Sequence, residues 1–335
     1  TLSFDDGDIG VSHDGTGLVL MGQSTDNIEV VGSVGVTVLG QEGNDALTGG
    51  SGSDDLSGGD GSDTLTGGLG NDILEGGDGS DVAVFAGAMS AFTFSASSDG
   101  TLTVTDTNAG TSLGVDTVSG VEALQFTDGV LTVTTLSDGR VTLTGDGGSN
   151  EVTVVGETPV TLEGGYGDDI LTGGSGSDDL EGGSGSDTVY GGDGSDFIDG
   201  DDGSDTLFGE GGSDDIDGGL GDDTLDGGLG SDVLDGGSGS DDLSGGDGSD
   251  IAVFAGDQSD YTFASSEDGL TVTVTQRYTG DADTVTNVET LSFDDGDIGV
   301  SHDGTGLVLT GQSTDNIEVV GSVGVTVLGQ EGNDA

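Results

Sequence analysis

Two kinds of hydrophobic pattern alternate along this chain. In residues 40–84 and 164–253, an apolar side chain returns at every ninth position; it is Leu, Ile or Val, except in the last unit of each block, where it is Ala. A fixed period of this kind is typical of repeat architectures, in which one short unit stacks on the next. Each unit therefore predicts a very short strand with one apolar side chain that points inward.

The pattern changes to strict alternation outside these two blocks. Residues 92–94, 101–105 and 141–144 alternate apolar and polar side chains, as half-buried strands do. Turn sequences such as Ser-Asp-Gly at residues 98–100 separate them. We expect two small spacer cores, one formed by Phe85, Phe92, Phe94, Leu102, Val104, Leu124 and Phe126, the other by Phe254, Tyr261, Phe263, Leu270, Val272 and Phe293.

The rest of each nine-residue unit predicts a turn. Its consensus is Gly-Gly-x-Gly-x-Asp-x-Leu-x, as in residues 218–226, with five units in the first block and ten in the second. Glycine permits positive φ angles and lets backbone carbonyls crowd toward one point. Two units then form one 18-residue coil, and identical turns stack at about the 4.8 Å strand spacing. We predict an all-β chain in which right-handed parallel β-rolls alternate with small β-sandwich-like spacers.

A longer repeat overlies the short one. Residues 1–46 recur as residues 290–335 with one difference, Met21 against Thr310, so we expect a 289-residue module in tandem. No secretion signal is visible and the chain starts at Thr1, so we expect it to be part of a longer protein. The predicted division is 1–39 (end of a spacer), 40–84 (short roll), 85–163 (spacer), 164–253 (long roll), 254–328 (spacer) and 329–335 (start of the next roll).

Charge excludes several classes of partner. The 335 residues include 66 acidic side chains and two arginines, for a formal net charge of −64. Nucleic-acid phosphates and anionic membrane surfaces would repel such a chain, and no apolar run approaches the roughly 20 residues that span a bilayer. Cysteine is absent, which excludes disulfides and thiolate metal sites. High charge with low hydrophobicity is typical of disorder, but a divalent cation could neutralise a charge that recurs at a fixed period.

The aspartate at the sixth position of each unit is the candidate metal ligand. Stacking places Asp63 beside Asp45 and Asp81, each two units away, and like charges that close repel strongly unless a cation separates them. Calcium suits the gap because it is a hard ion that takes roughly 6–8 oxygen ligands, backbone carbonyls included. The predicted ligands are Asp45, Asp54, Asp63, Asp72, Asp81, Asp169, Asp178, Asp187, Asp196, Asp205, Asp214, Asp223, Asp232, Asp241 and Asp250.

These repeats resemble the RTX (repeats-in-toxin) family. The spacers also contain RTX-like sequences, Val-Phe-Ala-Gly at residues 84–87 and Val-Glu-x-Leu-x-Phe at residues 121–126. The resemblance implies that each calcium ion takes the carbonyls of positions two and four and the Asp of one unit, with the carbonyls of positions one and three and the Asp of the unit two later. It thereby implies three ions in the short roll and eight in the long one, about eleven in all. Since Asp201 and Glu210 stand where the unit has Gly, as Gln41 does in the first unit, we expect weaker sites around Asp201 and Glu210.

Other conspicuous residues have structural interpretations. No zinc-protease, nucleophile-elbow or phosphate-loop motif is present, so we predict no enzyme activity and no catalytic residue. We expect His13 and His302 to lie in surface turns. Acids outside the sixth position are interpreted as surface charge, for example Glu163, Glu181, Asp199 and Asp217, and the aromatic residues Tyr166, Tyr190, Phe197 and Phe208 as packing along the roll.

Three functions remain open. The first is a calcium-rigidified structural repeat of a giant secreted surface protein: an adhesin stalk, a surface layer or a matrix fibre, with neighbouring copies and host-surface, glycan or matrix ligands as partners. The second is the secretion and folding domain of an exported enzyme or toxin, and the third is a module in which a spacer binds a ligand directly. The resemblance implies type I secretion, disorder at low cytosolic calcium and folding at extracellular calcium of about 10⁻⁴–10⁻³ M.

Overall fold

The computed structural model describes residues 2–4, 7–13, 17–108, 113–267, 269–302, 306–311, 317–320 and 325–329. The chain divides into two compact units, residues 1–163 and 164–335. The helical elements in the described ranges are two short 3-10 turns, η1 (Met89–Ala91) and η2 (Gln258–Asp260). The predicted all-β fold class is confirmed. None of the helices in these ranges is long and apolar enough to cross a membrane.

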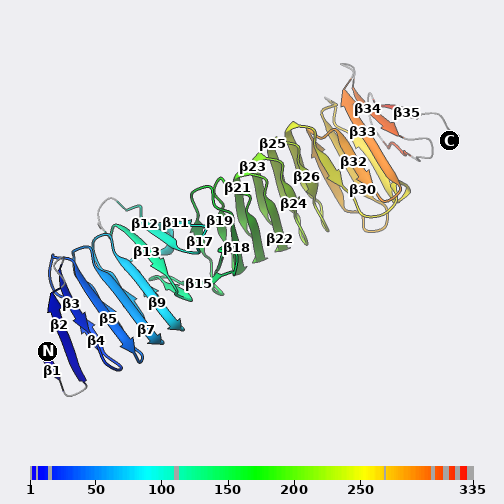
Figure 1. Ribbon diagram of the computed structural model, residues 1–335. Helices are drawn as coiled ribbons and strands as arrows, with labels where there is room; N and C mark the ends of the chain where they lie inside the picture. The colour runs from blue at the N-terminus through cyan, green and yellow to red at the C-terminus, as the bar shows by residue number, and fades with distance from the viewer. Residues whose placement is uncertain are drawn as a thin grey trace. The chain divides into compact units, whose positions relative to one another are not determined.

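The first unit contains two sheets. Its strands are β1 (Leu2–Phe4), β2 (Gly7–His13), β3 (Leu18–Met21), β4 (Asn27–Glu29), β5 (Val36–Glu42), β6 (Ala46–Thr48), β7 (Asp55–Gly61), β8 (Thr64–Thr66), β9 (Ile73–Gly79), β10 (Val82–Val84), β11 (Phe92–Ala96), β12 (Leu102–Asp106), β13 (Val115–Ser119), β14 (Ala123–Gln125), β15 (Val130–Thr135), β16 (Val141–Thr144), β17 (Glu151–Thr153) and the start of β18 (Val160–Tyr166). One sheet has the order β1-β2-β3-β5-β7-β9-β13-β12-β11 (Figure 1). The other runs β4-β6-β8-β10-β14-β15-β16-β18.

The second unit repeats this plan with a longer roll. Its strands are β19 (Ile170–Thr172), β20 (Asp179–Gly185), β21 (Thr188–Gly194), β22 (Phe197–Gly203), β23 (Thr206–Gly212), β24 (Asp215–Asp217), β25 (Thr224–Gly230), β26 (Val233–Asp235), β27 (Asp242–Gly248), β28 (Ile251–Val253), β29 (Tyr261–Ser265), β30 (Thr271–Gln276), β31 (Ala282–Thr286), β32 (Thr290–Phe293), β33 (Gly296–His302), β34 (Leu307–Gly311) and β35 (Thr326–Gly329). One sheet runs β19-β21-β23-β25-β27-β31-β30-β29, and the other β20-β22-β24-β26-β28-β32-β33-β34-β35.

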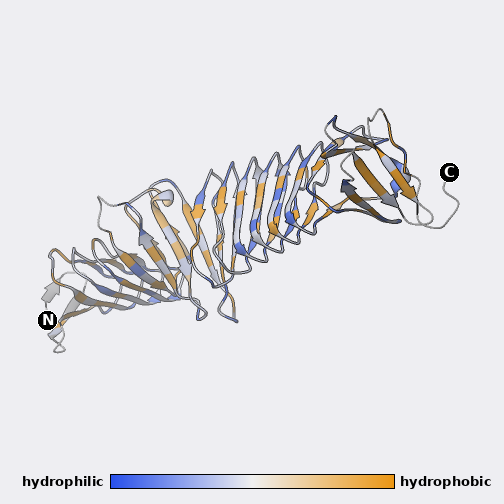
Figure 2. Cartoon of the chain, turned by 90° about the horizontal axis from the view of Figure 1, so that it is seen from above, coloured by the Kyte–Doolittle hydropathy of each residue, from blue (hydrophilic) through white to orange (hydrophobic). Residues whose placement is uncertain are grey.

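Paired residues on neighbouring roll strands lie 18 residues apart, as the predicted 18-residue coil requires. Leu47 on β6 pairs in parallel with Leu65 on β8, and Leu207 on β23 pairs in the same way with Leu225 on β25. Every residue at the eighth position of a unit is at most 1% exposed. Hydrophobic segments accordingly recur from strand to strand along the long roll (Figure 2). The interior of each roll is therefore two columns of single apolar side chains.

The spacers extend the sheets of the rolls. In the first unit, β13 pairs in parallel with β9, and β14 pairs in parallel with β10, before antiparallel strands follow on each side. Ala83, the small residue in the last unit, lies opposite Leu124 of the spacer, and Ala252 lies opposite Leu291. In each unit the last inward residue of the roll thus lies beside a strand of the following segment. The division into separate spacer domains stays a prediction.

The two spacer cores contain matching aromatic clusters. Phe85 stacks on Phe126 at 5.6 Å between ring centroids, and Phe254 stacks on Phe293 at 5.3 Å. The predicted core residues are buried in both spacers except Leu270, which is 60% exposed, so that prediction is wrong. Strand β30 begins one residue later, at Thr271, and alternation then points Val272 inward and leaves Leu270 in the preceding turn.

Candidate metal centre

The sixth-position aspartates form a hydrogen-bonded ladder in each roll. We call the fifteen predicted ligands the aspartate ladder; each is at most 3% exposed. The backbone N–H of Asp45 donates to Oδ1 of Asp63 (2.7 Å), and that of Asp205 donates to Oδ1 of Asp223 (2.8 Å). The same bond joins each ladder aspartate to the one two units later, at 2.7–3.0 Å throughout both rolls.

The second carboxylate oxygen has a different environment. In most of the ladder, Oδ2 is buried and has no hydrogen-bond partner, as in Asp45, Asp63, Asp72, Asp81, Asp187, Asp196, Asp205, Asp214, Asp223, Asp232 and Asp250. A buried carboxylate oxygen that lacks a donor is costly, because the charged group has lost its water. Because this arrangement recurs along the ladder, a further group with a positive charge or a hydrogen-bond donor must satisfy these oxygens.

Backbone carbonyls gather beside the same oxygens. A Cβ added to Gly218, at position one of its unit, would lie 2.8 Å from Asp223 Oδ2 and 2.8 Å from the carbonyl oxygen of Gly236, two units later. At Gly227 the corresponding distances are 2.6 Å to Asp232 Oδ2 and 2.7 Å to the carbonyl oxygen of Gly245. Only glycine leaves this space open. The carboxylate and carbonyl oxygens therefore line one small cradle per unit.

The donor set of these cradles consists of oxygen only. In the part of the chain that the structure describes, no group of three or more His, Cys, Asp or Glu side chains is placed to hold a metal ion. The ladder supplies its acidic side chains in pairs, so backbone carbonyls must provide many of the ligands. Hard, oxygen-rich and flexible coordination of this kind suits calcium and does not suit zinc or copper.

Burial of the ladder shifts its protonation. Burial, helped by like charges in adjacent turns, raises the pKa of Asp205, Asp214 and Asp241 to about 7, although backbone N–H donors oppose the shift. The same causes raise the pKa of Asp196 to about 6. The folded roll thus disfavours ionised aspartates at neutral pH unless a cation offsets their charge.

Two ladder aspartates are arranged differently. Oδ2 of Asp54 accepts a hydrogen bond from the backbone N–H of Gly50 (2.6 Å), and Oδ2 of Asp178 accepts one from Gly174 (2.8 Å). Both aspartates lie in the second unit of a roll, and in both the turn closes on its own carboxylate.

The three turns with a substituted glycine keep the repeat backbone. Gln41, Asp201 and Glu210 have φ angles of 83°, 64° and 68°, in the left-handed region that glycine normally occupies. The corresponding Gly219 has a φ of 89°. The carbonyl positions are thus retained, with local backbone strain at the three substituted residues. The expected weakening of sites near Asp201 and Glu210 stays a prediction.

The ladder continues into the spacers, which sequence analysis missed. The N–H of Asp72 donates to Asp116 Oδ1 (2.8 Å), and the N–H of Asp241 donates to Asp283 Oδ1 (3.0 Å). Glu122 and Glu289 accept the same bond from the last aspartate of each roll, and at the start of the first roll the N–H of Asp26 donates to Asp45 Oδ1 (2.6 Å). The sequence signal was the shared Asp-Thr-Val-x-x-Val-Glu segment at residues 116–122 and 283–289.

The remaining candidates lie outside the ladder. Tyr190 stacks on Phe208 with ring centroids 5.0 Å apart, whereas Tyr166 is 71% and Phe197 43% exposed. The predicted packing along the roll therefore holds for Tyr190 and Phe208 but not for Tyr166 and Phe197. His302 ends strand β33 and is exposed, and β2 ends at His13. The acids Glu181, Asp199, Asp217 and Asp235 lie in register on neighbouring strands, and Glu163 accepts a hydrogen bond from Thr144.

Fold and cradles together define a parallel β-roll with oxygen-lined cradles along its turns. The family model for the RTX calcium-binding nonapeptide repeat matches residues 37–65, 48–83, 161–189, 190–225 and 217–252. The two rolls are thus RTX β-rolls, and their repeats are of the kind that binds calcium.

A solved structure of an extracellular enzyme also shows some similarity to the chain. The extracellular lipase LipA from Serratia marcescens matches with 20% sequence identity and a TM-score of 0.27 over 77% of this chain. The chain covers 38% of the lipase chain, well under half of its length. A search of curated proteins found no match.

Proposed function

We propose that the aspartate ladder binds calcium in the cradles and that calcium holds the rolls folded. The observation that carries this is the buried Oδ2 without a donor, beside a carbonyl oxygen two units later, as at Asp223 and Gly236. The ladder pairing gives three ions in the short roll and eight in the long one. All fifteen aspartates contribute, and Asp54 and Asp178 must release a backbone N–H to do so.

We further propose a structural role in a large secreted surface protein, such as an adhesin stalk, a surface layer or a matrix fibre. The start of a second module supports this. Val19 on β3 pairs with Thr37 on β5, and the equivalent Val308 on β34 pairs with Thr326 on β35 in the same register. A module whose end repeats its own beginning is suited to extension in series. The alternative, a folding domain of an exported enzyme or toxin, predicts a catalytic domain encoded next to this region instead of further modules.

Export before folding follows from the same chemistry. With 66 acidic residues and two arginines, the metal-free chain resists compaction, so it would pass unfolded through a type I secretion channel. Calcium at millimolar concentration outside the cell would then fold it. Copies of the module, and glycan or matrix ligands, are the partners this location would offer. We propose no catalytic role.

Circular dichroism tests the central claim. At neutral pH in a chelator, the chain should give a coil spectrum, and calcium in the range of about 10⁻⁴–10⁻³ M should convert it to a β spectrum. Magnesium at equal concentration should not, because it demands near-octahedral geometry and keeps its waters. A calcium-independent β spectrum at neutral pH would contradict the proposal.

A further inference from the structure

The last aspartate of each roll has no following repeat unit, yet its environment is the same as inside the roll. Asp81 ends the short roll and is fully buried; Asp250 ends the long roll and is 1% exposed. Oδ2 of both has no hydrogen-bond partner. Inside a roll, the unit two later would supply a carbonyl and a carboxylate at this point. Here the chain has already entered the spacer.

The spacer supplies the missing carbonyl. A Cβ built on Gly76 would contact the carbonyl oxygen of Gly120 and would lie 2.8 Å from Asp81 Oδ2. In the second unit, a Cβ built on Gly245 would contact the carbonyl oxygen of Asn287 and lie 2.7 Å from Asp250 Oδ2. These carbonyls therefore occupy the place that the carbonyl at position one of the unit two later occupies inside the rolls.

Left-handed backbone marks both spacer turns. Gly120 has a φ of 57°, and Asn287, its counterpart in the second spacer, has a φ of 52°. Gly and Asn are the residues that adopt this conformation at the lowest energy. The same strained geometry occurs in two sequences that differ at this residue, so the turn is a shared feature of the two junctions.

The spacer also supplies the missing carboxylate. Oε2 of Glu122 accepts the backbone N–H of Asp81 (2.7 Å), and Oε2 of Glu289 accepts that of Asp250 (2.9 Å). Inside a roll, the ladder aspartate two units later accepts this bond. Six residues separate Asp116 from Glu122, against nine between successive ladder aspartates, so a longer side chain bridges the shorter turn. Both glutamates are exposed residues, which leaves room for water in the coordination sphere.

We propose that each roll ends in one additional calcium site that the spacer completes: Asp81 Oδ2, Gly120 O and Glu122 in the first unit, and Asp250 Oδ2, Asn287 O and Glu289 in the second. The proposal rests on calcium binding by the ladder and adds two ions to those within the repeats. Each terminal ion would join a roll to its spacer, so that calcium fixes the junction as well as the coils.

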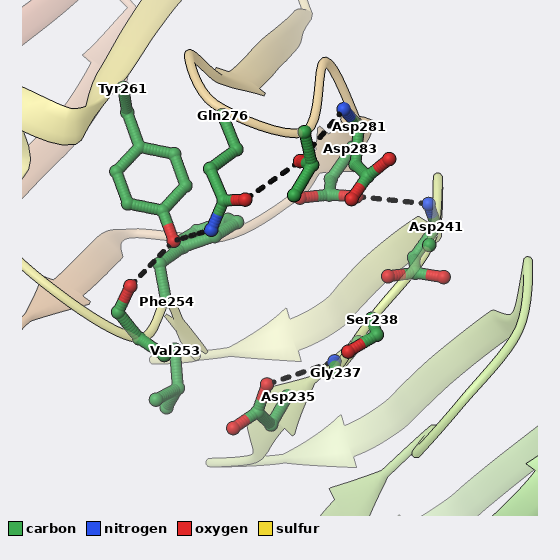
Figure 3. A pocket seen from close by; sticks show the side chains of 14 residues that line it. Asp235, Gly237, Ser238, Asp241, Val253, Phe254, Tyr261, Gln276, Asp281 and Asp283 are labelled. Carbon is green, nitrogen blue, oxygen red and sulfur yellow. Dashed lines mark hydrogen bonds between the residues drawn. The ribbon is translucent and has the colours of Figure 1, made fainter.

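The other side of each junction, where Asp72 meets Asp116 and Asp241 meets Asp283, serves as an internal comparison. Asp241 donates its N–H to Asp283 there, but the three atoms nearest to a Cβ built on Gly236, at 2.5–2.8 Å, all belong to Asp241, whereas at Gly245 the nearest atom is a carbonyl oxygen. A cavity of about 160 Å³ opens instead, lined by Asp241, Asp283, Tyr261, Gln276 and neighbours (Figure 3). The first junction has an equivalent cavity beside Gly67 and Asp116. We assign no ion to this edge.

Glu122→Gln and Glu289→Gln test the proposal, with Asp116→Asn and Asp283→Asn as matched controls. The amides can still accept the backbone N–H but remove the charge. In equilibrium dialysis at saturating calcium, the double glutamine variant should bind two fewer ions than the unchanged chain, and the double asparagine variant should bind the same number. Each single glutamine variant should lose one ion, which keeps the test usable should the double variant fail to fold.

Crystals of the unchanged chain soaked in terbium provide a second readout. Anomalous peaks should lie beside Glu122 and Glu289 and be absent beside Asp116 and Asp283. An unchanged ion count in the glutamine variants, or no peak at the glutamates, would overturn the terminal sites alone, provided that peaks line the ladder. No bound ion anywhere along the ladder would overturn the proposed function itself.

Discussion

Each ladder aspartate uses its two oxygens for different tasks. Oδ1 fixes the position of the turn two units earlier through a backbone N–H, while Oδ2 faces the cradle. An aspartate at least two units from either end of its roll is therefore shared by two neighbouring pairs. Asp187, for example, accepts from Asp169 and donates its own N–H to Asp205. A change at one residue should affect two sites.

Asp187→Asn should weaken both sites that share this residue. The amide can keep the hydrogen bond from Asp169, but it offers calcium a neutral oxygen in place of a carboxylate. We expect an apparent dissociation constant at least about tenfold higher for two ions, which corresponds to roughly 1.4 kcal/mol each. Calorimetry would measure this. Asp215→Asn, at an exposed position of β24, is the control and should leave all sites unchanged. An effect on a single site would disprove the shared arrangement.

Asp201→Gly and Glu210→Gly should stabilise the calcium-loaded chain. Both residues adopt left-handed φ angles in the structure, which costs a non-glycine residue about 1–2 kcal/mol. We expect a gain of about 1 kcal/mol for each change, with a lower calcium midpoint by circular dichroism. Asp201→Ala and Glu210→Ala remove the same side chains but keep the strain. If the alanine variants gained as much as the glycine variants, charge rather than backbone geometry would be the cause.

At the scale of the strand and the turn, the nine-residue period was sufficient to predict the roll. One buried residue per unit and a glycine-rich turn leave only one register, so Leu56 must lie opposite Leu74. The period was not sufficient at the junctions. Glu122 joins the ladder although its unit is three residues short, because a longer side chain replaces Asp. Leu270 was misplaced because alternation alone does not say at which residue a strand begins.

The ladder as a whole should make metal-free folding dependent on pH. The pKa of Asp205, Asp214 and Asp241 rises from 3.8 to about 7 in the fold. A raised pKa means that the folded state binds protons more tightly than the unfolded chain, so protonation stabilises the fold. This stabilisation is complete below pH 3.8 and is lost as the pH rises through 7. In a chelator, circular dichroism should show β structure appearing as the pH falls from 8 toward 4.5.

Folding at acid pH would need no metal, so the acid-folded state should be insensitive to a chelator. Addition of more chelator at pH 4.5 should leave the β spectrum unchanged. At pH 8, by contrast, chelator should abolish the β spectrum of the calcium-loaded chain. A metal-free chain that stays a coil at pH 4.5 would show that repulsion between buried carboxylates is not what keeps it unfolded.

At the scale of the whole molecule, one plan is used twice within the chain. Each unit contains a roll, a pair of spacer acids that extend the ladder and an aromatic cluster, as shown by Asp116 and Asp283 and by Phe126 and Phe293. The eleven ions of the repeats would offset 22 of the 64 net negative charges. The loaded protein would thus stay strongly anionic, which favours its solubility.

The edge of β34 has a consequence for how a long array would assemble. It receives β35 in the register in which β3 receives β5, so in a tandem array the finished end of one module would serve as the template for the first coil of the next. Growth onto an existing end avoids the unfavourable first step of building an isolated coil. In a tandem array, that nucleation barrier would be crossed once, and every later module would be added by elongation.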